Sequence, residues 1–327
     1  MSDRRSVPGI SIMPSGLYRV LGPGLQHTIE VARIADAAGV DELLLGDHVV
    51  MSDRTDRYPY GPFAWPPEGV YHDPATAPAG EKISPAEPAW PEPLTVLAAL
   101  AAATKRLRLG TGVLLVPLRP ATLLAKQVAT LDVLSGGRVE LGVGVGWQRE
   151  EYAAQGLRFR DRWLHLDDTL RACRALWEQV PPVSFVSPSV NFERVYCMPQ
   201  PMQRRLPIFF GARATAALAR RIAELGDGWF PLAARSPAEV AAGAAVIKEA
   251  LRAAGRDPAS LDIRVPLTLR RTRSGTLDRP GTMAAVPAWV EAGATMLWVV
   301  IGPDLGLRSM RDVASFIEAV VSLKGRD

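Results

Sequence analysis

Hydrophobic and polar positions follow two alternating patterns along the chain. Short runs of consecutive apolar residues, such as residues 296–301, are typical of parallel strands that are buried on both faces. Between these runs, apolar residues recur three or four positions apart, as Trp163, Leu166 and Leu170 do, which is the spacing of one helix face. We therefore expect strands and helices to alternate from one end of the chain to the other.

Eight strand-like runs can be recognised, and each is followed by a helix-like segment. The expected strands cover residues 9–15, 42–48, 107–116, 139–146, 206–212, 227–232, 261–269 and 296–302. The expected helices cover residues 25–40, 93–106, 121–138, 163–177, 214–226, 237–255, 283–294 and 310–323. Strict alternation predicts the α/β class, and eight units predict a TIM-type (β/α) barrel of eight parallel strands rather than an open sheet.

Two insertions interrupt what we interpret as a single domain of residues 1–327. Residues 51–93 follow the second strand and are rich in proline, glycine and aromatic residues. We interpret them as a lid, because they follow the strand end at which barrels carry their chemistry; a passive surface loop is the alternative. Residues 180–205 alternate like a β-hairpin and precede the fifth strand.

The composition excludes several classes of protein. Of the 327 residues, 48% are hydrophobic and 22% are charged, and 38 Lys and Arg against 34 Asp and Glu give a net charge of +4. Basic and aromatic residues do not cluster as they do on nucleic-acid-binding surfaces. The longest apolar run falls short of the roughly 20 residues of a membrane span. We expect neither a nucleic acid nor a membrane as partner, and the mild positive charge suits a polyanionic small molecule.

The remaining compositional features favour a cytoplasmic enzyme without a metal. Cys173 and Cys197 are the only cysteines and form no CxxC motif, which is typical of a reducing cytosol. Residues 1–10 lack the apolar stretch of a signal peptide. The four histidines have no convincing metal-ligand spacing, so we expect no metal site.

The first candidate residues for catalysis follow the second strand. In "DELLLGDHVV", Asp47 and His48 come directly after a run of leucines. Polar residues at strand ends often form caps and turns, and this structural role is one interpretation. In a barrel, however, functional groups gather at the C-terminal ends of the strands, which favours a catalytic role for the pair.

Two further strand ends indicate a site for a flat group and an anion. Gly142, Gly144 and Gly146 remove side chains from one face of the fourth strand, so that a flat group can lie there, although no complete G-x-G-x-x-G motif is present. After the fifth strand, Arg213 lies in a turn of small residues that opens a helix. Free N–H groups and a guanidinium there suit a phosphate, and a tight turn with a solvated arginine is the alternative.

The order and spacing of these motifs resemble the luciferase-like monooxygenase family and, within it, the oxidoreductases that depend on the deazaflavin coenzyme F-420. The resemblance runs through nearly the whole chain. Its most specific stretches are "GDHVV", "YPYG…WPPEGVY", "RLRLGTGVLLVPLRPATLLAKQVATLDVLSGGRVELGVGVGW" and "IFFGARATAALARRIAELGDGWFPL". The family implies a barrel that holds FMN or coenzyme F-420 at the C-terminal ends of its strands.

The resemblance also implies which residues form the site. The family's Asp-His pair falls on Asp47 and His48, which are the expected catalytic residues. Its non-prolyl cis peptide bond falls on Gly112–Val113. The residues expected to bind the cofactor are Asp47, Thr111, Gly112, Val113, Gly144, Val145, Gly146, Glu150, Gly211, Ala212 and Arg213.

The sequence departs from the family at three places, and the first two weaken the case for sugar-phosphate oxidation. The branch with that activity has an acidic residue just after the glycines of the fourth strand, where this chain has Trp147. It also has a tryptophan shortly after its Asp-His pair, where this chain reads "VVMSD". Ala212 replaces a second glycine that many relatives have in the phosphate turn.

We therefore expect an oxidoreductase that uses coenzyme F-420 for hydride transfer to or from a small organic substrate. His48 would move a proton or stabilise charge at the edge of the ring, and Asp47 would bond the ring or orient the imidazole. One alternative is a monooxygenase that uses reduced FMN and oxygen, and another is a flavin- or deazaflavin-binding protein without turnover. A homodimer is common in the family and is possible here.

The aromatic residues suggest the nature of the substrate. Several stand in the first insertion, and Trp147 lies at the end of the fourth strand; we expect them to favour an apolar or aromatic molecule. The insertion residues are Tyr58, Tyr60, Phe63, Trp65 and Tyr71.

Overall fold

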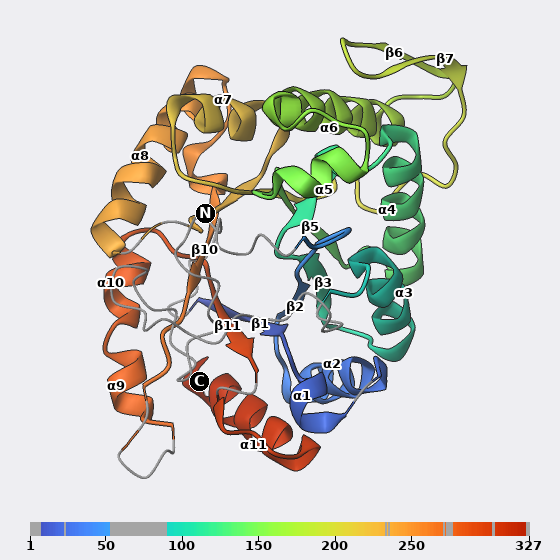
Figure 1. Ribbon diagram of the computed structural model, residues 1–327. Helices are drawn as coiled ribbons and strands as arrows, with labels where there is room; N and C mark the ends of the chain where they lie inside the picture. The colour runs from blue at the N-terminus through green and yellow to red at the C-terminus, as the bar shows by residue number, and fades with distance from the viewer. Residues whose placement is uncertain are drawn as a thin grey trace.

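The computed structural model describes residues 8–22, 24–52, 90–232, 234, 236–270, 272, 277–302 and 305–324. Within these residues, parallel strands form a closed barrel inside a ring of helices (Figure 1). The barrel strands are β1 (Gly9–Pro14), β2 (Glu42–Leu45), β3 (Arg108–Thr111), β5 (Val139–Gly144), β8 (Ile208–Gly211), β9 (Gly228–Phe230), β10 (Asp262–Pro266) and β11 (Met296–Ile301). Their order is β3-β2-β1-β11-β10-β9-β8-β5, and pairing of β3 with β5 closes the ring. The predicted eight-stranded barrel is confirmed.

Helices separate successive strands and cover the outside of the barrel (Figure 1). They are α1 (Tyr18–Leu21), α2 (Gln26–Ala38), α3 (Pro93–Ala103), α4 (Ala121–Ser135), α5 (Arg149–Ala154), α6 (Arg162–Glu178), α7 (Ala216–Leu225), α8 (Pro237–Ala253), α9 (Arg279–Met283), α10 (Val286–Glu291) and α11 (Met310–Val321). The sequence pattern did not predict the short helices α1 and α5. The expected continuous helix over residues 283–294 is wrong, because Pro287 lacks an N–H and lies instead in the first turn of α10.

The two insertions differ in what the structure describes. The predicted hairpin before the fifth strand is confirmed as β6 (Val183–Val186) paired antiparallel with β7 (Asn191–Val195). It projects from the outer side of the ring, beyond α6 (Figure 1). Most of the first insertion, residues 53–89 with the five aromatic residues named above, lies outside the described residues.

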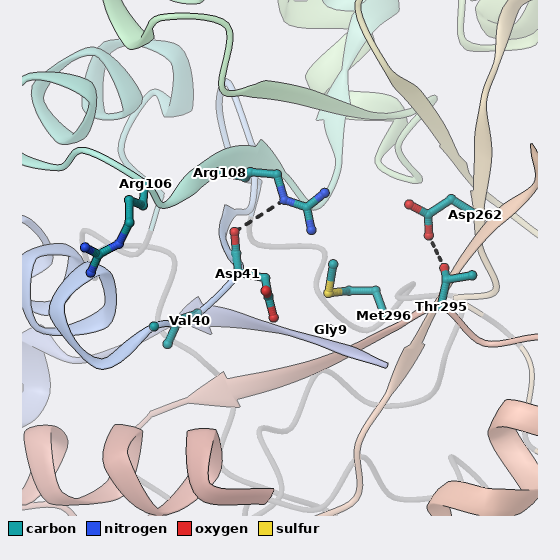
Figure 2. A pocket seen from close by; sticks show the side chains of 9 residues that line it. Gly9, Val40, Asp41, Arg106, Arg108, Asp262, Thr295 and Met296 are labelled. Carbon is teal, nitrogen blue, oxygen red and sulfur yellow. Dashed lines mark hydrogen bonds between the residues drawn. The ribbon is translucent and has the colours of Figure 1, made fainter. Parts of the chain in front are cut away.

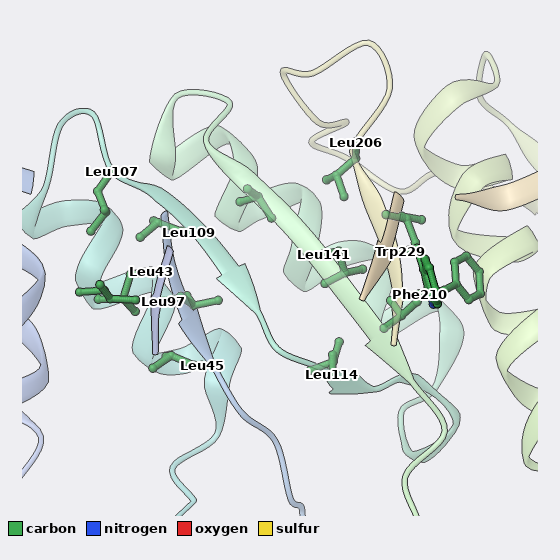
Figure 3. Close-up of a cluster of buried hydrophobic side chains, with 14 of the residues drawn as sticks. Leu43, Leu45, Leu97, Leu107, Leu109, Leu114, Leu141, Leu206, Phe210 and Trp229 are labelled. Carbon is green, nitrogen blue, oxygen red and sulfur yellow. The ribbon is translucent and has the colours of Figure 1, made fainter. Parts of the chain in front are cut away.

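Alternating side chains of each strand serve two separate cores. Leu43 and Leu45 belong to the large core between the barrel and its helices, where they lie near Leu97 of α3 (Figure 3). Leu44 belongs instead to a small cluster with Phe209 and other aromatic side chains. The fully buried run of leucines thus follows from a strand with apolar packing on both faces.

A charged cluster fills the barrel near the amino-terminal ends of the strands. Arg264 of β10 is paired with Glu42 of β2 and, at 2.5 Å, with Glu140 of β5. Its guanidinium carbon also lies 3.5 Å from the ring centroid of Phe209. Since β2, β5 and β10 are not neighbours in the sheet, a side chain that reaches all of them lies in the barrel interior. The buried cation links strands from different sides of the barrel.

Candidate active site

The candidate site lies at the C-terminal ends of β2, β3, β5 and β8, which open at the same end of the parallel barrel. The chain leaves β2 through Gly46, Asp47 and His48. It leaves β5 through Gly146, with a φ of +66°, and enters α5 two residues after Trp147. Because Gly146 tolerates this left-handed conformation, the chain turns sharply and α5 begins beside the end of β2.

His48 is held by a buried carboxylate. Its Nδ1 lies 3.2 Å from Oε2 of Glu151, which is in the first turn of α5. The Glu151 side chain is fully buried, and 9% of the His48 side chain is exposed. The other carboxylate oxygen, Oε1, accepts a hydrogen bond of 2.6 Å from the backbone N–H of Val49. The carboxylate therefore fixes both the imidazole and the backbone next to it.

Two indole rings flank this imidazole. The centroid of Trp90 lies 4.9 Å from that of His48 at an interplanar angle of 74°, and that of Trp147 lies 6.0 Å away at 80°. Trp90 packs against Gly46, where an added Cβ would lie 2.7 Å from Cζ3 of the indole. Its Nε1 is buried and has no hydrogen-bond partner within the described part of the chain. A donor without an acceptor thus lies close to His48.

Asp47 has a different partner from the one expected. Its carboxylate accepts hydrogen bonds from Nη1 and Nη2 of Arg119, at 2.6 and 3.1 Å, and from the N–H of Leu115 at 2.8 Å. Burial alone would lower the pKa of Arg119, but the hydrogen bond and charge of Asp47 raise it above its ordinary value. Asp47 thus anchors the loop after β3, and the expected orientation of the imidazole by Asp47 is corrected: Glu151 performs that role.

The segment after β3 contains the predicted cis peptide bond. Gly112–Val113 is cis, which confirms that expectation. Beyond it, the short strand β4 (Leu114–Leu115) pairs with β5. The Val113 side chain lies between the ends of β5 and β8. A Cβ added to Gly144 of β5 would lie 2.6 Å from Cγ2 of Val113, and a Cβ added to Gly211 of β8 would lie 2.7 Å from its Cγ1.

The glycines of the fourth barrel strand serve packing inside the protein, which corrects the expectation of an open face for a flat group. An added Cβ at Gly142 would lie 2.0 Å from the carbonyl oxygen of Thr111, and Gly144 accommodates Val113. The Thr111 hydroxyl in turn donates to the Gly142 carbonyl at 2.7 Å. A flat ligand would therefore contact the mouth beyond Val113 rather than the strand itself.

The turn after β8 presents an exposed cation. Arg213 is exposed, and no described residue forms an ion pair or hydrogen bond with it. The helix α7 follows, and its capping residue Thr215 accepts from the N–H of Leu218 at 3.1 Å. The guanidinium and the start of α7 remain suited to an anion at the rim of the mouth.

Sequence reasoning missed three residues of this site. Glu150 was expected to bind the cofactor, but its neighbour Glu151 contacts His48. Two adjacent acids at a helix start give no signal of which one is buried. Arg119 and Trp90 are 72 and 42 positions from their contacts, so only the fold brings them to Asp47 and His48.

A hollow of about 570 Å³ lies at the amino-terminal ends of the strands, whereas His48 follows the carboxyl-terminal end of β2. It is lined by the first residues of several strands, including Gly9, Arg108 and Asp262 (Figure 2). At this hollow Arg108 donates to the carbonyl of Asp41, and Thr295 donates to Asp262 (Figure 2). Since its polar groups already pair with one another, we assign the chemistry to the carboxyl-terminal mouth.

The described residues contain neither a cluster of metal ligands nor a membrane-spanning helix. No group of three or more His, Cys, Asp or Glu side chains there is placed to hold a metal ion. Among the described helices, none combines the length and the apolar character needed to cross a membrane.

Comparisons with known proteins identify the family of this chain. A family model described as luciferase-like monooxygenase matches residues 10–273. An uncharacterized protein of Mycobacterium tuberculosis is 32% identical over 237 residues, which are 71% of this chain and 75% of that protein. The FMNH(2)-dependent dimethylsulfone monooxygenase of Pseudomonas putida is 35% identical over 143 residues, which are 42% of this chain and 38% of that enzyme.

A solved structure extends the likeness of fold to the full length. It is an F-420-dependent secondary alcohol dehydrogenase in complex with an F-420–acetone adduct, similar with a TM-score of 0.72 at 16% identity. The match covers 98% of this chain and 100% of that chain. The family model spans most of the sequence, and the barrel has the same fold as this enzyme. The chain therefore belongs to the luciferase-like monooxygenase family, whose relatives are flavin- or deazaflavin-dependent oxidoreductases.

Proposed function

We propose that this protein uses coenzyme F-420 to transfer a hydride to or from a small organic substrate. The observation that carries the proposal is the environment of His48. Glu151 holds its Nδ1, and no described residue makes a hydrogen bond to its Nε2. An imidazole that is fixed on one side and free on the other suits proton transfer to or from a bound molecule.

The residues at the mouth fit a cofactor with a polar ring and a phosphate-bearing tail. The buried Nε1–H of Trp90 is a donor that lacks a partner in the described structure, and it lies beside His48. Arg213 and the first turn of α7 offer charge and N–H groups for a phosphate. When bound, the deazaflavin supplies the hydride chemistry. His48 would then take the proton that a substrate hydroxyl loses on oxidation, or return it on reduction.

The charge of the chain supports the deazaflavin over FMN. The net charge of +4 suits a tail that carries several carboxylates. Reduced FMN with oxygen is the alternative, and cofactor binding without turnover is a second one.

The substrate proposed is apolar or aromatic. The indole rings of Trp90 and Trp147 both lie edge-on to His48. An apolar molecule bound beside these rings would leave water, which is favourable, and would pack against them. We propose a small organic molecule with one oxygen at the reacting carbon, which would face His48.

The experiment is a parallel titration of the purified chain with coenzyme F-420 and with FMN. Binding is followed by the fluorescence of each cofactor, and the bound cofactor is then tested for reduction or oxidation with a panel of small alcohols and ketones. We expect F-420 to bind at least tenfold more tightly than FMN and its spectrum to change with one class of substrate.

Each other result selects a different function. Tighter binding of FMN overturns the deazaflavin proposal and favours the monooxygenase. Tight binding of F-420 without any change of its redox state across the panel favours a protein that binds the cofactor without turnover. Binding of neither cofactor overturns the assignment of the mouth as a cofactor site.

A further inference from the structure

The carboxylate of Glu151 receives two donors, one on each oxygen. The backbone N–H of Val49 donates to Oε1 at 2.6 Å, and Nδ1 of His48 lies 3.2 Å from Oε2. The Glu151 side chain is fully buried, so both contacts are shielded from water. In the described structure, water therefore does not compete with either partner for the carboxylate oxygens.

These contacts determine where His48 carries its proton. A carboxylate has only acceptors, so the nitrogen that faces it must be the N–H of the ring. In a neutral imidazole the other nitrogen then has the lone pair. We infer that Glu151 is a positioning residue, which keeps the proton of His48 on Nδ1 and leaves Nε2 as the atom that exchanges a proton with the substrate.

The surroundings keep this arrangement in place. The Tyr152 hydroxyl, next in the chain to Glu151, donates to the carbonyl of Val145 and thereby ties α5 to the end of β5. Burial raises the pKa of Tyr152 well above its ordinary value, so the hydroxyl keeps the hydrogen that it donates. The edge-on contacts of Trp90 and Trp147 restrict rotation of the imidazole. The role of Nε2 in proton exchange rests on the proposed function, whereas the location of the proton rests on the contacts alone.

Glu151→Gln provides a matched test because the amide has nearly the shape of the carboxylate. Its oxygen can accept from only one of the two donors, and its NH₂ group cannot accept. The Val49 N–H cannot reverse its role, but the imidazole can move its proton from one nitrogen to the other. The amide oxygen should therefore face Val49, and its NH₂ group should donate to Nδ1, so that the ring proton moves to Nε2.

The measurement is the ¹⁵N spectrum of the histidine rings in the full chain, recorded without cofactor at a pH at which the rings are neutral. The chain has only four histidines, and His48→Gln identifies the signals of His48 by their loss. We expect the wild-type ring to carry its proton on Nδ1 and the Glu151→Gln ring to carry it on Nε2. The signals of His27 and His165 serve as internal controls and should not move.

The wild-type spectrum is decisive even if the variant does not fold. A wild-type His48 ring with its proton on Nε2 overturns the inference, and so does a folded Glu151→Gln chain in which the proton stays on Nδ1. Because the measurement needs no cofactor, its failure leaves the proposed function standing. Conversely, a failed titration with F-420 leaves the tautomer result intact.

Discussion

At the scale of single residues, two neighbours after β2 have separate partners and separate tasks. Asp47 is paired with Arg119, which anchors the loop after β3, and His48 is paired with Glu151 on α5. An adjacent Asp and His therefore need not form a dyad. Within the described residues, Nε2 of His48, Nε1 of Trp90 and the exposed Arg213 are available to a ligand at this mouth.

Substitution of His48 should change turnover, whereas substitution of Arg213 should change cofactor binding. His48→Ala should leave the affinity for F-420 nearly unchanged and slow turnover about 10²–10⁴-fold, as expected for a lost general acid or base. Arg213→Ala should weaken cofactor binding by roughly 1.5–3 kcal/mol, because a charged hydrogen bond to phosphate is lost. The measurement is cofactor affinity by fluorescence beside single-turnover rates with saturating cofactor. Loss of binding in His48→Ala, or no effect of Arg213→Ala, means that the ring and tail have been misplaced.

At the scale of elements, the ends of β3, β5 and β8 are held together by one side chain. Val113 follows the cis peptide bond and packs against Gly144 of β5 and Gly211 of β8. The two glycines have no side chains and so leave room for the valine, which packs against both strands and forms part of the wall of the mouth.

Gly144→Ala tests this packing. Its Cβ would lie 2.6 Å from Cγ2 of Val113, so the valine or the strand must move, at a cost of about 1–3 kcal/mol in the free energy of unfolding. The double variant Gly144→Ala/Val113→Ala removes the clash and should be more stable than Gly144→Ala alone. Urea unfolding of the single and double variants measures both effects. A wild-type midpoint for Gly144→Ala would show that the glycine is not needed there, as would strictly additive losses in the double variant.

The elements themselves could be predicted from sequence, but their junctions could not. Consecutive apolar residues predicted the barrel strands, because these strands pack on both faces. Helical spacing predicted the longer helices, and Gly39 ends α2 with a φ of +86°. No periodicity marks α5, which has six residues and lies where the chain turns at Gly146. The partner of His48 is 103 positions away. Which residue becomes that partner depends on the direction in which α5 leaves the end of β5.

At the scale of the whole molecule, the candidate active site and the charged cluster around Arg264 lie at opposite ends of the barrel. The mouth has His48 and Arg213, whereas Arg264 holds Glu42 and Glu140 near the amino-terminal ends of the strands. Burial raises the pKa of Glu42 to about 7, with Arg264 opposing the shift and Glu140 adding to it. Burial alone would raise the pKa of Glu140 too, but Arg264 and Arg108 hold it below its ordinary value.

The stability of the fold should therefore fall as the pH rises from about 4.5 to about 7. In this window folded Glu42 keeps a proton that the unfolded chain releases, so the unfolded state gains relative stability with rising pH, by up to roughly 3 kcal/mol. The pKa of Glu140 is lowered in the folded state, so Glu140 adds a slope of the opposite sign only near the lower end of this window, where the unfolded chain still binds a proton at this residue. Glu42→Gln, which is neutral at every pH, should flatten the curve. The check is the free energy of urea unfolding at several pH values; equal slopes in the variant and the wild type would contradict the assignment.

The position of the cofactor is the central claim, and a crystal structure of the chain with coenzyme F-420 tests it most directly. We expect the deazaflavin ring at the carboxyl-terminal mouth, beside His48 and Trp90, with the phosphate of the tail at Arg213 and the start of α7. His48 should still contact Glu151 through Nδ1 and face the ring with Nε2. A cofactor bound in the hollow at the amino-terminal ends of the strands, or a ring at Arg213 with its tail at His48, would contradict the account.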